Sequence, residues 1–170
     1  MHPGAPDHSL GYGPAQLGMT LEALRAAASA DGGLACRPAH GSKPLPPGMQ
    51  WCVDRGGRLL PHSYHAGYTF LPDQVGVPHL VAFEVVGMDA DYPLVESRLR
   101  QALGPPSEPV TRQEAKRPGG ASFVIIRETW EALHGDARLD RASPAPGYFG
   151  LSIDSEAAPP LATQPPHSPS

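Results

Sequence analysis

The sequence predicts an α+β fold: a mostly antiparallel sheet of about four to five strands with two helices on one face, between disordered Pro-rich termini. Residues 79–86, 121–130 and 148–154 carry the apolar patterns and the β-branched or aromatic residues of strands. Residues 20–30 and 91–103 repeat apolar side chains at helical spacing. The chain of 170 residues is long enough for one hydrophobic core.

The first third of the chain predicts one helix and two short strands. The helix at residues 20–30 opens with Thr20 as its N-cap and Glu22 in its first turn, where the helix dipole favours an acid. Two short apolar runs follow at residues 34–37 and 49–53. We interpret them as short strands or extended arms joined by a loop rich in proline and glycine.

The clearest local pattern lies at residues 79–106. Val81, Phe83 and Val85 occupy alternate positions and therefore share one face of the expected strand. Asp91 stands where a helix N-cap is needed, and the following helix ends before a Gly-Pro-Pro stop. Because folding explains every residue of this segment except Glu84 and Met88, we expect function in the less regular residues on either side, above all residues 36–77.

The remaining third predicts two further strands. Residues 104–120 are polar and bounded by prolines, which is typical of a long surface connection. Residues 121–130 present apolar side chains on both faces and are expected inside the sheet. Residues 131–139 form either a helical turn or a strand interrupted at His-Gly-Asp, and residues 148–154 alternate as a half-solvated strand does.

Composition divides the chain into three parts. Its 22 prolines and 19 glycines make up about a quarter of the residues and concentrate in five segments, residues 1–18, 37–48, 104–120, 143–147 and 157–170. Residues 1–16 are therefore predicted to be a disordered N-terminal arm and residues 155–170 a disordered Pro-rich tail. Residues 17–154 between them form the expected single domain.

Charge and hydropathy argue against nucleic-acid binding and against a transmembrane segment. The net charge is −4 and the basic residues form no broad cluster, so nucleic-acid binding is not expected. No apolar run approaches the roughly 18 residues that span a bilayer, so no transmembrane segment is expected. The first residues as written carry no secretory signal. The compartment is left open, with a preference for a periplasmic or secreted mature chain.

The two cysteines allow three interpretations. Cys36 and Cys52 enclose 15 residues, and a disulfide between them would stabilise the fold by about 3 kcal/mol in an oxidising compartment. Two free thiols in a cytoplasmic protein are the first alternative. A zinc site that uses Cys36, Cys52, His62 and His65 is the second, although the spacings match no compact zinc finger.

The aromatic segment at residues 61–77 is the predicted contact region. Its expected partner-binding residues are His62, Tyr64, His65, Tyr68 and Phe70. The segment is either a surface loop with aromatic anchors or one more strand near residues 68–71. Trp51 and Trp130 are expected in the core instead.

Two short stretches resemble a known family. GMTLEALR at residues 18–25 resembles the opening of the first helix in the small outer-membrane assembly lipoprotein (SmpA-like) family, and LRQALGPP at residues 99–106 resembles helix ends found there. The resemblance covers about twenty residues. It implies a compact domain of two helices against an antiparallel sheet that acts by protein–protein contact without catalysis.

The function predicted from the sequence is a non-enzymatic binding or accessory subunit that docks onto a larger protein assembly. Residues 61–77 and the Pro-rich ends are its expected contact segments. No catalytic residue and no cofactor are predicted, since the GLSID sequence around Ser152 lacks the second glycine and the following helix of a nucleophile elbow. The alternative is a small zinc-binding protein.

Overall fold

The structure is a computed structural model that describes residues 10–28, 33–40, 44–54, 59–143, 147–156 and 158. Its helices are α1 (Leu21–Ala28) and α2 (Tyr92–Leu103), the latter preceded by a 3-10 turn at Asp89–Asp91. The strands are β1 (Gly11–Tyr12), β2 (Ala15–Gln16), β3 (Leu34–Pro38), β4 (Gln50–Asp54), β5 (Tyr64–Pro72), β6 (Pro78–Met88), β7 (Thr111–Lys116), β8 (Ser122–Ala132), β9 (Gly135–Ser143) and β10 (Tyr148–Ser155).

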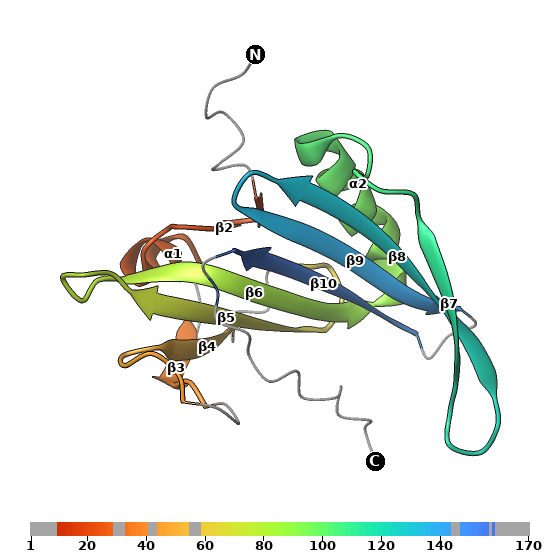
Figure 1. The fold of residues 1–170 in the computed structure, drawn as a ribbon, viewed down its shortest axis with the longest axis horizontal. Helices are drawn as coiled ribbons and strands as arrows, with labels where there is room; N and C mark the ends of the chain where they lie inside the picture. The colour runs from red at the N-terminus through yellow and green to blue at the C-terminus, as the bar shows by residue number, and fades with distance from the viewer. Residues whose placement is uncertain are drawn as a thin grey trace.

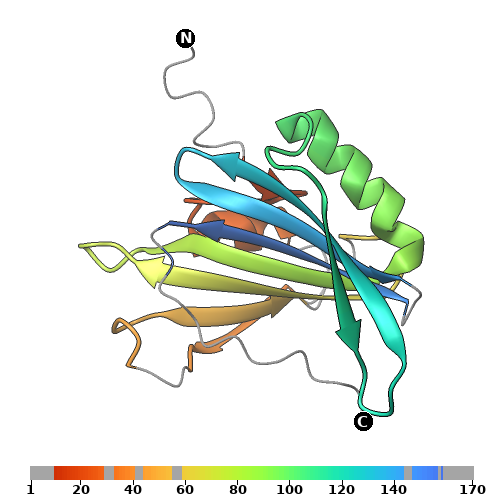
Figure 2. The same cartoon turned by 45° about the vertical axis from the view of Figure 1, so that its right-hand side comes forward.

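Eight of these strands form one antiparallel sheet. Their order is β3-β4-β5-β6-β10-β9-β8-β7, and β1 pairs with β2 separately (Figure 1). Each helix is followed by four strands that pair in sequence, so the chain builds one topology twice. The last strand of each half, β6 and β10, pair with each other at the centre of the sheet. Figure 2 shows β7 running steeply across one edge of the sheet.

The predicted α+β fold with four to five strands is wrong, because the protein is mostly β with two short helices. Three segments without a clear strand signal pair into the sheet: β5 within residues 61–77, β7 within the expected surface connection, and β9 directly after the turn at residues 133–134. The sequence of β7, Thr-Arg-Gln-Glu-Ala-Lys, is mostly exposed. Hydrogen bonds to β8 make this edge segment a strand without an apolar face.

The strongly patterned elements are confirmed. Strands β6, β8 and β10 coincide with the three predicted strands to within a residue or two, and α2 coincides with the helix predicted at residues 91–103. α1 lies within the helix predicted at residues 20–30, of which residues 29–30 lie outside the described residues. Gly104 ends α2 with a φ of 82°, and its N–H donates to the carbonyl of Arg100 at 2.9 Å. Glycine adopts this left-handed conformation without the clash of a Cβ, which explains why the helix stops there.

A β-bulge changes the predicted faces of β6. Thr69 pairs with Ala82 and Phe70 pairs with Leu80, so Val81 is the extra residue between two partners. The bulge turns Leu80 to the same side as Phe83, and both are buried. An inserted residue reverses the alternation of a strand, so the strict alternation expected for residues 79–86 fails at this point.

Both helices pack on one side of the sheet, behind the strands in Figure 1, and this side holds the core. The core joins Leu24 of α1 and Leu99 of α2 to the inward side chains of the sheet. Its largest fully buried members are Trp130, Phe70, Phe149, Leu24, Leu80, Leu99, Leu139, Leu151 and Ile153. Each such aliphatic or phenyl side chain stabilises the fold by about 1.5–3 kcal/mol when buried.

Part of the predicted N-terminal arm belongs to the folded domain. Leu10, Tyr12 and Ala15 are buried in the core, around the β1–β2 pair. Residues 1–9 of the predicted arm lie outside the described residues. The same holds for most of the predicted tail, residue 157 and residues 159–170.

Candidate functional site

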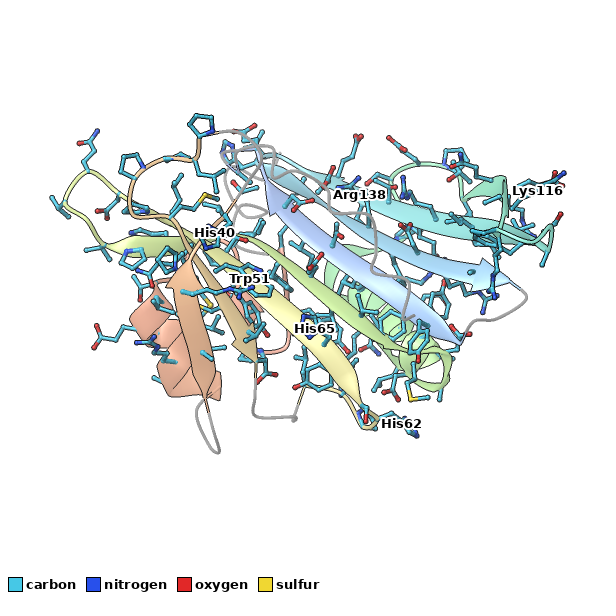
Figure 3. The ribbon with its side chains drawn as sticks, turned by 90° about the horizontal axis from the view of Figure 1, so that it is seen from below. His40, Trp51, His62, His65, Lys116 and Arg138 are labelled. Atoms are coloured by element: carbon cyan, nitrogen blue, oxygen red, sulfur yellow. A yellow bond between two sulfur atoms is a disulfide. The ribbon has the colours of Figure 1, made fainter. Side chains whose placement is uncertain are left out.

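The side of the sheet opposite the helices forms a broad surface, here called the open face. The strand register assigns to it Arg37, Trp51, His65, Gly67, Glu84, Val86, Met88, Arg127, Asp136, Arg138, Asp140, Tyr148, Gly150, Ser152 and Asp154. Figure 3 looks at this side of the molecule and labels Trp51, His65 and Arg138. No described helix covers it.

Three large apolar side chains gather on the open face where the two central strands meet at one end, the last residues of β6 and the first of β10. Val86, Met88 and Tyr148 are 43 %, 40 % and 50 % exposed. Met88 pairs directly with Tyr148 across the β6–β10 junction, and Val86 lies two residues along β6 from Met88. We call these three residues the apolar patch. An outward strand face normally alternates to polar residues, so the patch points to contact with another molecule.

Trp51 lies on the open face instead of in the core. Its indole lies over Gly67, the Arg37 guanidinium stacks 4.8 Å from the ring centroid, and the His65 ring is 6.4 Å away. Trp51 faces outward because its neighbour Cys52, which is fully buried, takes the inward position. The core prediction is therefore wrong for Trp51 and confirmed for Trp130.

Gly150 leaves a depression beside the apolar patch. It lies within β10 and pairs with Val86 on one side and Asp140 on the other. A Cβ atom added at Gly150 would meet no atom within 4 Å, whereas one added at Gly67 would lie 2.9 Å from the Trp51 indole nitrogen. The two glycines of the open face therefore differ, because the Trp51 indole occupies the space a Cβ atom would need at Gly67, whereas at Gly150 that space is open.

Most charges on the open face pair with each other. Arg127 donates two hydrogen bonds to Asp140, at 2.7 and 2.8 Å, and Arg138 donates one to Asp154 at 2.9 Å. Partial burial raises the pKa of Asp136 against the lowering effect of nearby Arg138. Glu84 is exposed and has no ion-pair partner within the described residues.

The structure places the five predicted contact residues in different environments. Tyr68 and Phe70 are buried in the core and are not available for contact. The Tyr64 hydroxyl donates to Asp54 and accepts from the Leu59 N–H at 2.8 Å, so it ties the β4–β5 connection. Of the five predicted residues, His65 is the one that lies exposed on the open face (Figure 3).

His62 is held by Asp91. The His62 ring Nδ1 lies 2.7 Å from Asp91 Oδ1, and the His62 N–H donates to Asp91 Oδ2 at 2.9 Å. Burial raises the pKa of Asp91, but the hydrogen bonds and charge of His62 outweigh it, so the pKa is lowered. Asp91 precedes α2 as predicted yet makes no side-chain cap bond. Its carboxylate instead hydrogen-bonds to His62 and so links the segment before β5 to the start of α2.

Cys36 and Cys52 form a disulfide between the edge strand β3 and β4, which confirms the predicted pairing. The sulfur atoms of a disulfide are not the thiolates that zinc requires. The alternative zinc set of Cys36, Cys52, His62 and His65 thus loses two ligands while the bond is intact. No group of three or more suitable ligands occurs among the described residues.

Sequence reasoning missed a buried polar cluster on the helix side. Glu128 is 2 % exposed and accepts hydrogen bonds from the Tyr92 hydroxyl at 2.8 Å and from Arg100. A hydrogen bond to Glu128 is the main cause that raises the pKa of Glu96. Because each of these groups has a partner, the cluster fixes α2 on β8 and serves the fold.

A cavity of about 550 Å³ lies at the end of α2. Its lining consists of Leu10, Ala102, Leu103, Trp130, Glu131, Ala132 and Leu133. Glu131 is the single titratable group of this lining, so the cavity lacks the converging polar groups of a catalytic site.

No protein-family model, curated protein or solved structure matches this chain. Among the described residues, no helix is long and apolar enough to cross a membrane.

Proposed function

We propose that this protein is a non-enzymatic binding subunit that docks a larger protein partner on its open face. The observation that carries the proposal is the apolar patch of Val86, Met88 and Tyr148, exposed at one end of the central strands on a sheet face that no described helix covers. Grouped exposed apolar residues on a folded surface are typical of interaction sites.

The residue types around the patch support this proposal. Aromatic side chains, methionine and arginine are enriched in protein interfaces, and the open face offers two such pairs, Arg37 with Trp51 on β3 and β4 and Met88 with Tyr148 on β6 and β10. The paired charges on β8, β9 and β10 lie beside the patch, as the polar rim of an interface does. His65 pairs with Val86 of the patch, and its ring lies 6.4 Å from that of Trp51, so it connects the two pairs.

The polar clusters give less support to catalysis. His62 is paired with a buried carboxylate, as catalytic histidines are, but no serine, threonine or cysteine hydrogen-bonds to its ring within the described residues. Glu128 is enclosed by its own partners. A binding role needs neither group in a reactive state.

The disulfide leads us to propose an oxidising compartment, periplasmic or extracellular, for the mature protein. Structural disulfides persist in such compartments and are rare where glutathione keeps thiols reduced. The intact mass of protein from the native host, measured without reductant, should lie two hydrogens below the mass of the reduced chain. A fully reduced pair would contradict this placement.

The docking proposal is tested by site-specific photocrosslinking in the native host. A benzophenone amino acid replaces Tyr148 in the patch, and the control replaces Val75, which is 84 % exposed in the β5–β6 turn at the other end of β6. We expect a defined protein adduct from position 148 and none from position 75. Adding Met88→Asp should abolish the adduct.

Equal adducts at both positions, or none at position 148, would remove the support for an open-face interface. Because both labelled positions are exposed, the fold should tolerate both probes. Unchanged far-UV circular dichroism of each labelled protein verifies this.

A further inference from the structure

Gly150 has no structural reason to be glycine. Its φ is not positive, so the backbone does not require glycine, and a Cβ atom there would meet no atom within 4 Å. Glycine inside a strand lowers stability by about 0.5–1 kcal/mol relative to alanine. A glycine of this kind often marks a site where another molecule approaches the sheet closely.

The depression over Gly150 has an apolar side. Val86 is its partner on β6, while Tyr148 and Ser152 lie two residues to either side on β10. On β9 the depression is bounded by Asp140, whose carboxylate is held by Arg127. Since Val86 and Tyr148 are both about half exposed, a side chain from outside can enter along them.

An unpaired negative charge lies next to this depression. Glu84 is exposed on β6, pairs with Ser152, and is therefore the diagonal neighbour of Gly150. Such neighbours are about 7–8 Å apart. Asp140 and Asp154 on the same face are paired with arginines, whereas Glu84 has no ion-pair partner within the described residues. The unpaired charge next to Gly150 is thus negative.

We propose that the docked partner segment inserts a lysine or arginine side chain into this depression. Its aliphatic stem lies on Gly150 between Val86 and Tyr148, and its cationic head pairs with Glu84. Lysine and arginine each combine an apolar stem with a charged end, and each is long enough to reach from Gly150 to Glu84. The inference rests on the proposed docking function and names the partner as a basic, apolar peptide segment.

The test uses a random peptide library displayed on phage, selected on the full-length protein and counter-selected on Met88→Asp. We expect enriched peptides to carry lysine or arginine beside apolar residues. The affinity of each peptide is then measured by fluorescence anisotropy. Glu84→Gln should weaken binding by about tenfold, because a charge-assisted contact is lost.

Two further variants complete the series. Gly150→Tyr should abolish binding while the protein stays folded, because the space above Gly150 is empty. Glu22→Gln is the matched control: Glu22 is an exposed glutamate in the first turn of α1, on the helix side, and its replacement should leave affinity unchanged. Raising the salt concentration should weaken wild-type binding more than binding to Glu84→Gln.

The outcomes separate the two proposals. Peptides that require Met88 but lack basic residues, or that bind Glu84→Gln as tightly as wild type, would overturn the proposed insertion of a basic side chain over Gly150. The proposal that a partner docks on the open face would still stand. If no selected peptide depends on Met88, both proposals fail. A dimer of this chain in analytical ultracentrifugation that Met88→Asp dissociates would assign the face to a second copy and overturn the basic-peptide inference.

Discussion

The two glycines of the open face give a sharp test of the structure, because one substitution should act in opposite directions at them. Gly67 and Gly150 both lie in interior strands of the sheet. A Cβ atom at Gly67 would lie 2.9, 3.0 and 3.1 Å from three atoms of the Trp51 indole, and one at Gly150 would contact nothing within 4 Å. We therefore compare Gly67→Ala with Gly150→Ala.

The expected magnitudes follow from these distances. Gly150→Ala should raise the free energy of unfolding by about 0.5–1 kcal/mol, since alanine reduces the freedom of the unfolded chain. Gly67→Ala has the same gain but must push the indole outward, at a cost of about 1–3 kcal/mol for overpacking. Moving the indole also weakens its stacking with Arg37, worth about 0.5–1 kcal/mol. The net result at Gly67 is a loss of about 2 kcal/mol, within a range of about 0.5–3.5 kcal/mol.

Urea unfolding and thermal unfolding, both followed by far-UV circular dichroism, give the free energy of unfolding and the melting temperature of each variant and of the wild type. The melting temperature should rise by about 2–4 °C for each kcal/mol gained and fall likewise for each lost. The Trp51 indole N–H resonance, assigned with Trp51→Phe, should shift in Gly67→Ala and stay unchanged in Gly150→Ala. Equal stability changes in the two variants, or an unmoved Trp51 resonance in Gly67→Ala, would refute the assigned geometry.

Three further predictions concern the links that hold the sheet and helices. Replacing Cys36 and Cys52 together by serine should lower the free energy of unfolding by about 3 kcal/mol; equal urea midpoints with and without reductant would contradict this. Glu128→Gln should lower it by about 1.5–3 kcal/mol, because a buried carboxylate loses charge-assisted bonds; calorimetry measures the change, and an unaltered melting temperature would count against the cluster. For Asp91, whose pKa is lowered in the fold by His62, the stabilisation is present above its unfolded value near 3.8 and is lost as the pH falls through the folded pKa. The stability difference between wild type and Asp91→Asn should therefore shrink in acid, and a difference independent of pH would be inconsistent with the pair.

The segment at residues 61–77 shows how a strand signal was missed. Ala66, Tyr68 and Phe70 are buried and alternate with His65 and Gly67, so β5 does carry a period of two. The nearby prolines and the aromatic content favoured a loop, and the strand became clear only with its partners β4 and β6 in place. The alternation from Ala66 to Phe70 is the signal that would have found it.

The candidate site was predictable in part. The segment at residues 36–77 does contain Trp51 and His65 of the open face. The apolar patch was not predicted: folding explained Val86, and Met88 was left, with Glu84, as a residue without a folding role but also without a predicted function. Their role depends on Tyr148, which reaches them through the β6–β10 pairing.

The sequence by itself determined the local elements: the two helices, the stop at Gly104, and the strands β6, β8 and β10. These depend on periodicity and chain stiffness over a few residues, which any stretch of sequence displays directly. It also favoured the pairing of Cys36 with Cys52, with free thiols and a zinc site left as alternatives.

Only the tertiary structure decided the order of the strands, the bulge at Val81 and the outward position of Trp51. These features depend on hydrogen bonds between segments distant in the chain, and one residue of register moves every side chain to the other face. The same pairing places Met88 beside Tyr148 and Glu84 diagonal to Gly150. The proposed interface therefore arises from strand register, which local sequence patterns do not encode.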